Sequence, residues 1–236
     1  LNTTASNNTA VGYQAGYSNT TGTQNVAVGR LALLDNTTGG YNVALGNGSL
    51  ENNTTAGYNV AVGYQALYTN TTGTQHVAMG RQALFANTDG NQSTAIGQRA
   101  LYANTTGDFN TALGYAALQN NSTASENTAV GYQAGLLTNT GTLNVVVGVK
   151  ALADNTTGSS NVAIGREALH TNTTASDNVA VGKHSLRVNT TGASNVAVGK
   201  DALIANTTGV NNTAVGHLAG SAITTGGACT FIGEGA

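Results

Sequence analysis

The stretch Asn25-Val26-Ala27-Val28-Gly29 decides the fold of this chain, because it returns every 17 residues with only small changes. We number the 17 repeat positions from its first residue, so that Asn25 is position 1 and Gly29 is position 5. The closing glycine marks the period most clearly. It recurs fourteen times at a constant spacing, as Gly12, Gly29, Gly46, Gly63, Gly80, Gly97, Gly114, Gly131, Gly148, Gly165, Gly182, Gly199, Gly216 and Gly233.

This uniform spacing predicts one continuous repeat domain over residues 1–236, since a linker or a second domain would shift the phase. Only the last repeat, residues 221–236, departs from the pattern. There Ile223 and Cys229 replace asparagines, and Phe231 replaces an alanine. We interpret residues 221–236 as a decaying last repeat.

The length and alternation of the repeat predict an all-β fold. Seventeen residues are too few for the helix pair of common helical repeats. The pattern of residues 25–29 has a period of two, which is typical of a strand. The β-branched residues at positions 2 and 4 also favour extended backbone. Glycines at positions 5 and 15 suit turns with positive φ. Each repeat is therefore expected to form one coil of a β-solenoid (β-roll) with two short strands, giving about fourteen coils.

Stacked coils would bring identical residues together along the solenoid. We expect position 1 to form a structural ladder, in which the amides of Asn25, Asn42 and Asn59 bond to the coils before and after. Gly29, Gly46 and Gly63 are the expected turn residues of the same ladder.

Position 3 suggests that one chain is not enough. If Val26 and Val28 fill the coil interior, then Ala27, Ala44 and Ala61 face outward, although this position is never polar. Such an apolar stripe usually marks an interaction surface. We therefore expect a contact between chains at these alanines, most simply in a parallel homotrimer. The open strand edges at the two ends also favour end-to-end assembly.

Variable residues gather at the expected corners of the coil. Seven of the eight Lys and Arg residues lie at positions 6 or 7, and no charge occurs at positions 1 to 5. Exposed tyrosines suit contacts with glycans or proteins. Tyr13, Tyr64, Tyr115 and Tyr132, all at position 6, are thus candidate surface contacts for a host-surface glycan or protein.

The pattern resembles repeats of phage-type tail fibres, in runs such as residues 8–15 and 70–73, and the head repeats of trimeric autotransporter adhesins, whose period is shorter. The resemblance covers the whole chain. It implies an extracellular, trimeric structural fibre for attachment, located on a cell surface or a virion.

Other classes of function have little support in the sequence. The net charge of −2 offers no footprint for nucleic acid, and no apolar run is long enough to insert into a membrane. The four histidines and the carboxylates are scattered over the repeat, so we expect no enzyme, no metal site and no cofactor. The single cysteine excludes an internal disulfide.

Ice binding is the alternative function. Thr37-Thr38 recurs in nearly every repeat, and flat ranks of Thr on a β-solenoid can bind ice. Adjacent strand residues point to opposite faces, so only one Thr per coil would face water, with Asn36 and Thr38 as the outward pair. A single file of Thr makes this function the second choice.

Overall fold

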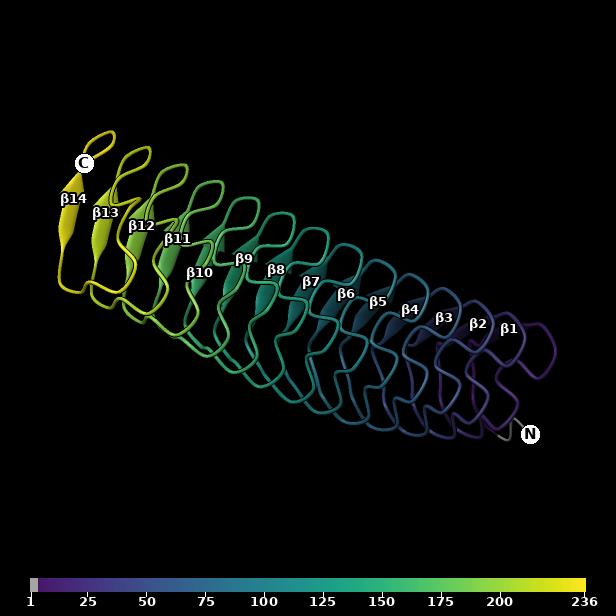
Figure 1. The fold of residues 1–236 in the computed structure, drawn as a ribbon. Coiled ribbons are helices and arrows are strands. Elements are labelled where there is room, and N and C mark those ends of the chain that lie inside the picture. The colour runs from purple at the N-terminus through teal and green to yellow at the C-terminus, as the bar shows by residue number, and fades with distance from the viewer. Residues whose placement is uncertain (1–3) are drawn as a thin grey trace. The chain divides into compact units, whose positions relative to one another are not determined.

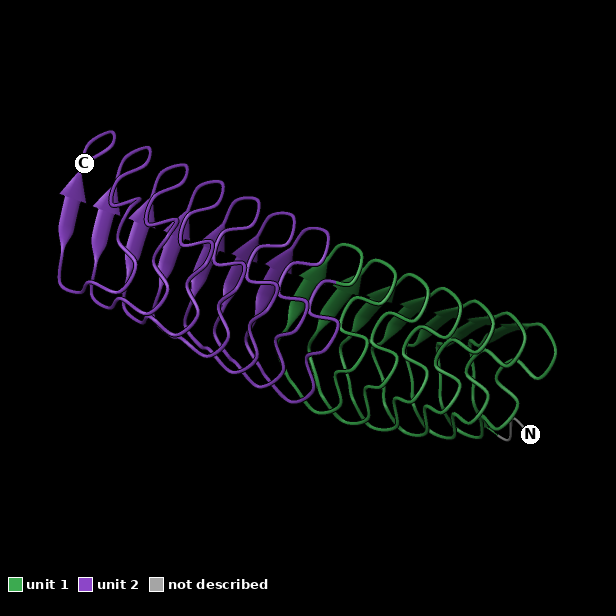
Figure 2. Cartoon of the chain, viewed as in Figure 1, with its two compact units in different colours: residues 1–116 green, residues 117–236 purple. Residues whose placement is uncertain are grey.

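The computed structural model describes residues 4–236, and the chain divides into two compact units, Leu1–Ala116 and Ala117–Ala236 (Figure 2). Each unit holds seven three-residue strands. The first has β1 Thr9–Val11, β2 Val26–Val28, β3 Val43–Leu45, β4 Val60–Val62, β5 Val77–Met79, β6 Thr94–Ile96 and β7 Thr111–Leu113. The second has β8 Thr128–Val130, β9 Val145–Val147, β10 Val162–Ile164, β11 Val179–Val181, β12 Val196–Val198, β13 Thr213–Val215 and β14 Thr230–Ile232.

Within each unit the strands pair in parallel and in chain order (Figure 1). The register is one repeat, so that Val26 lies beside Val43 and Ala27 beside Ala44. Backbone bonds link each coil to the next, as from the Val26 N–H to the Asn42 carbonyl at 2.8 Å. Residues 4–236 contain no helix, and thus none that could cross a bilayer. The prediction of an all-β, parallel β-solenoid is confirmed.

The prediction of two strands per coil is wrong, because only positions 2 to 4 are extended. Positions 7, 9 and 17 adopt positive φ, as at Leu31, Leu33 and Tyr41; the first two lie in the turn that follows the strand, and the third lies in the bend before the next strand. Coil-to-coil bonds continue through these turns, as from the Leu33 N–H to the Ser49 carbonyl at 3.0 Å. The rest of the coil is thus ordered without being a strand.

The predicted direction of the strand side chains is also wrong. Ala27, Ala44 and Ala61 point inward and are at most 2% exposed, whereas Val28 is 37% exposed. In β2–β13 the middle residue is always buried and its two neighbours face out. Ala27, Ala44 and Ala61 therefore cannot form a contact between chains. The cause is the narrow interior, in which alanines at positions 3 and 8 pack with a large leucine at position 9.

Glycine is required at position 5, as predicted. Gly29, Gly46 and Gly63 have φ of 136°, 134° and 131°. A Cβ atom on Gly29 would lie 2.5 Å from the carbonyl oxygen of Gly46 in the next coil. Position 15 differs from the prediction, because its glycines do not adopt positive φ, and Ala56 is accommodated there. Position 15 needs a small residue rather than a left-handed one.

Leucine at position 9 takes a backbone conformation that is costly for a large side chain. Leu33 and Leu50 have φ of 53° and 50°, in the left-handed region. That conformation costs about 1–2 kcal/mol per residue. Complete burial of a leucine side chain contributes about 1.5–3 kcal/mol, so burial outweighs the strain. Ten of these leucines are fully buried: Leu33, Leu50, Leu67, Leu84, Leu101, Leu118, Leu152, Leu169, Leu186 and Leu203.

In two of the three coils where glycine replaces this leucine, the following coil changes as well; after Gly16, position 3 stays alanine, at Ala27. Gly135 and Gly220 lack the side chain, and position 3 of the next coil is then Val146 or Phe231 instead of alanine. A Cβ atom on Gly220 would lie 2.8 Å from Cδ2 of Phe231, so the ring fills the place of the missing leucine. This packing gives a structural reason for Phe231, which the sequence shows only as a departure from the repeat.

We expect Gly135 and Val146 to be energetically coupled. Val146→Ala should cost about 2 kcal/mol through the cavity that it leaves. Gly135→Leu should also destabilise, because even its Cβ would lie 3.0 Å from Cδ2 of Leu118. The double variant restores the common Leu/Ala pair and should cost at least about 1 kcal/mol less than the sum. Urea unfolding of the full chain measures this; additive effects would contradict the coupling.

Candidate interaction surfaces

The position 1 ladder forms as predicted, with a different bonding pattern. Asn25, Asn42 and Asn59 are buried. The backbone N–H of Asn42 donates to Oδ1 of Asn25 at 2.9 Å, and Nδ2 of Asn42 donates to the Ala56 carbonyl at 2.9 Å. Each side chain thus joins two coils and also ties position 1 to position 15 of its own coil. Its role is structural.

A second ladder, which sequence analysis missed, runs along position 12. The amide of Asn53 donates to Oδ1 of Asn36 at 2.8 Å and to the Ala56 carbonyl at 3.0 Å. Asn36 is buried, so the expected outward pair of Asn36 and Thr38 is wrong in its first member. The recurrence of Asn at position 12 was the available signal. In the second unit the ladder ends at Asn206, whose Oδ1 has no partner because Ile223 follows it.

His76 shows what the position 1 ladder requires. Its Nε2 donates to the Gly90 carbonyl at 2.6 Å, and its Nδ1 accepts the N–H of Ser93 at 3.2 Å. A neutral imidazole can supply both roles, as an asparagine amide does. Burial lowers the pKa of His76 and outweighs these hydrogen bonds, which keeps the ring neutral. The histidine therefore takes the place of an asparagine in the ladder.

The outward side chains of positions 2 and 4 form the surface that we call the sheet face. Position 4 always carries Val, Leu, Ile or Met, and position 2 carries Val or Thr. Several of these side chains are well exposed, among them Met79, Leu113, Val145 and Val147. In each unit this gives adjacent columns of apolar or β-branched residues on consecutive strands. An apolar stripe is therefore present, but it is formed by positions 2 and 4 and not by the position 3 alanines between them.

The most apolar row of the sheet face is on β9. Leu143, Val145, Val147 and Val149 are 53%, 40%, 37% and 46% exposed. They are consecutive outward residues of one coil, from position 17 to position 6. Four neighbouring exposed aliphatic side chains are unusual on a surface that meets only water.

The candidate surface tyrosines are exposed, and the three of the first unit, Tyr13, Tyr64 and Tyr115, are not on neighbouring coils. These three and Tyr132 of the second unit are each more than 40% exposed. Other aromatic residues do gather. Tyr68, Phe85 and Tyr102 form a stack with centroids 5.1–5.3 Å apart, and Tyr41 stacks on Tyr58 at 4.8 Å. Their faces cover one another, so the stacks present mainly edges to solvent.

The second unit carries a charged cluster on three consecutive coils. His184 lies between two carboxylates, with Nδ1 3.1 Å from Asp201 and Nε2 3.6 Å from Glu167. Arg187 and Arg166 also approach Glu167, at 3.0 and 3.3 Å. Burial raises the pKa of Glu167, but Arg187, Arg166 and His184 lower it by more, so it lies below its usual value.

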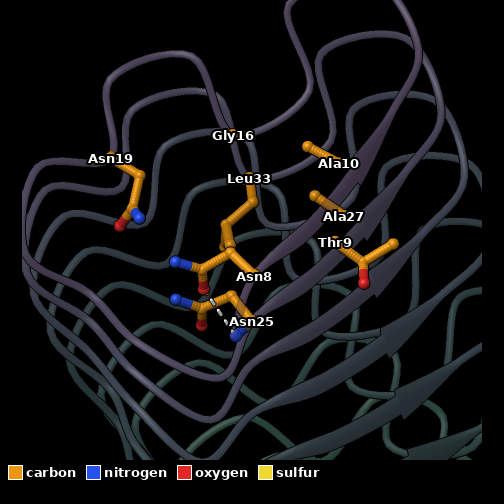
Figure 3. A pocket seen from close by; sticks show the side chains of 8 residues that line it. All are labelled: Asn8, Thr9, Ala10, Gly16, Asn19, Asn25, Ala27 and Leu33. Atoms are coloured by element: carbon orange, nitrogen blue, oxygen red, sulfur yellow. Dashed lines mark hydrogen bonds between the residues drawn. The ribbon is translucent and has the colours of Figure 1, made fainter. Parts of the chain in front are cut away.

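Two cavities are lined mainly by small, apolar and amide side chains. One of about 160 Å³ is lined by Ala10, Ala27 and Leu33 beside Gly16, with the amides of Asn8, Asn19 and Asn25 around it (Figure 3). It lies where Gly16 lacks a leucine and Ala27 does not compensate. A second, of about 330 Å³, lies beside Phe231. Neither is lined by His, Cys, Asp, Glu or Lys. Residues 4–236 contain no group of three metal-ligating side chains.

The threonines of positions 13 and 14 form one exposed file. The Thr37 hydroxyl donates to the Thr54 carbonyl of the next coil at 3.0 Å, and Thr37 is half-buried. Thr38, at position 14, is exposed. The repeated file of exposed threonines in this part of the coil is therefore that of position 14, and Asp89 interrupts it in the first unit.

Each asparagine of the position 12 ladder makes several hydrogen bonds, and these should contribute to the free energy of unfolding. Asn172→Ala removes one partner each from Oδ1 of Asn155, the Ala175 carbonyl and the Asn189 amide. The Ala175 carbonyl keeps its bond from Nδ2 of Asn161, and the Asn189 amide keeps its bond to the Gly192 carbonyl, so only Oδ1 of Asn155 is left unsatisfied. An unsatisfied buried group costs about 1–3 kcal/mol, and we expect a loss of that size in urea unfolding. The exposed control Thr174→Ala should change stability by less than about 0.5 kcal/mol. Equal stability of the two variants would show that the ladder is dispensable.

Glu167 should contribute stability that depends on pH. A carboxyl with a lowered folded-state pKa stabilises above its unfolded pKa of about 4.3, and this contribution is lost as the pH falls through the folded value. Glu167→Gln should therefore lower the thermal midpoint at pH 7, and the difference from the unsubstituted chain should shrink below about pH 4. Glu234→Gln, at a side chain that is 81% exposed, is the control. A difference that is constant from pH 7 to pH 3 would refute this.

The chain matches no protein-family model, no curated protein and no solved structure, so its family is not assigned by comparison.

Proposed function

We propose that this chain is a structural segment, shaft or head, of an extracellular fibre used for attachment, in which parallel copies pack against one another's sheet face. A trimer is the proposed assembly. The observation that carries the proposal is the sheet face itself, whose apolar columns recur on the strands of both units and remain exposed in a single chain. An exposed apolar surface that extends over many strands usually marks a protein interface.

The interior of the coils supports a structural role. Two asparagine ladders and continuous backbone bonding join each coil to its neighbours. Stability of this kind grows with the number of stacked repeats and leaves the corners free to vary. The described residues present polar and aromatic corners for contacts with a host glycan or protein, and the resemblance to tail fibres and adhesin heads favours the extracellular setting.

The sheet-face substitution Val145→Lys with Val147→Lys tests the proposal. Both residues are exposed on β9, so the double variant should fold while placing charge in the contact between chains. Sedimentation velocity at micromolar concentration should show an oligomer for the unsubstituted chain and a monomer for the double variant. The control Thr157→Lys, at an exposed position 14, should remain oligomeric.

A monomeric unsubstituted chain would contradict the proposed fibre. Thermal hysteresis in the same preparation would instead favour ice binding through the file of threonines. Because that file lies at position 14, hysteresis lost on Thr157→Lys but retained on the sheet-face variant would distinguish the two functions.

A further inference from the structure

In some rows of the sheet face the residues at the two margins are matched, and this suggests how copies meet. The margins are position 17 and, six residues later, position 6. They flank the strand of one coil on either side, with positions 2 and 4 between them. Position 17 is exposed throughout residues 117–228 of the second unit. Each row of the face therefore has one position 17 residue at one end and one position 6 residue at the other.

The match is visible in particular rows. Leu143 is the one large aliphatic residue at position 17, and Val149 is the one aliphatic residue at position 6; they fall in the same row. Asp177, the one aspartate at position 17, shares its row with Lys183. In the first unit, Tyr58 shares its row with Tyr64. The row of Asp177 and Lys183 is the one row of the chain with a charge at both margins, and the two charges are opposite.

Contacts within one chain do not explain the match. Val145 and Val147 stand between Leu143 and Val149, so these two side chains lie at opposite edges of the same row. Likewise Val179 and Val181 separate Asp177 from Lys183. The structure records no bond between the members of either pair. Matched residues that are separated in this way within one chain can contact each other only between two copies, where the position 17 margin of one meets the position 6 margin of the other.

We infer that copies of this chain associate by a heterologous contact, in which the position 17 margin of one copy meets the position 6 margin of the next at the same level. In a closed ring of parallel copies, every sheet face then turns toward the axis, and each row joins its counterpart. Leu143 of one copy would pack on Val149 of the next, and Asp177 would pair with Lys183. This inference rests on the proposed function and specifies the contact within it.

Cross-linking of the row on β9 provides the test. In a Cys229→Ser background, Leu143→Cys with Val149→Cys places one thiol on each margin, at side chains that are already exposed. A short bis-maleimide should join neighbouring copies into a covalent closed ring, seen as a trimer on denaturing gels. Either cysteine alone should yield no ladder beyond the monomer, because each margin then lacks its reactive counterpart.

Charge exchange on the next-but-one row is the second measurement. Asp177→Lys and Lys183→Asp should each weaken association at low salt by at least threefold in dissociation constant, because each places like charges together. The double variant reverses the pair and should regain most of the affinity. This readout does not depend on the geometry of a cross-linker.

The inference stands only if both measurements agree with it. Covalent products that stop at a dimer would indicate an isologous contact and overturn it, as would an oligomer that shows no cross-link or no recovery in the charge exchange. Those failures leave the proposed fibre intact, since the chain would still associate. A monomeric unsubstituted chain would remove both.

Discussion

Within each unit, residues stack on their counterparts 17 positions before and after them, and this self-contact governs nearly every choice in the repeat. A residue succeeds at a given position only if it can pack or bond with a copy of itself. Asparagine meets this condition, because its amide has a donor for one neighbour and an acceptor for the other. Glycine meets it at position 5, where adjacent coils approach too closely for a Cβ atom. Buried charges fail it, since like charges would stack.

The narrow interior is the second constraint, and it explains what the sequence could and could not predict. The period and the alternation were enough for the parallel solenoid, the turn at Gly29 and the Asn25 ladder. Alternation shows that Val26 and Val28 share a side, but it does not show which side is the interior. The answer depends on Leu33, which enters the same space from a left-handed turn and leaves room only for Ala27. Leucine rarely adopts a left-handed conformation, so that turn could not be predicted from the repeat pattern.

Because of the same geometry, the candidate interface lies on the side chains of positions 2 and 4 and not on the alanines of position 3. The reason for expecting an interface, an exposed apolar surface, is unchanged. Small residues inside oblige the larger aliphatic residues to face outward, so the apolar surface is a direct result of the thin core. For the corner tyrosines, the repeat pattern predicts less. Position alone predicted their exposure, but whether Tyr64 or Tyr132 contacts a ligand depends on a partner surface, and no repeat pattern encodes that.

The coupling expected between Gly135 and Val146 would have a consequence for how such a gene can change in length. Deleting or duplicating any block of 17 codons keeps every ladder in phase, because each coil meets only its neighbours. Breakpoints are not equivalent, however. Loss of residues 136–152 would leave the backbone register intact but place Ala163 after Gly135, with an unfilled space inside. Unequal recombination is thus tolerated best where both members of a packing pair are gained or lost together.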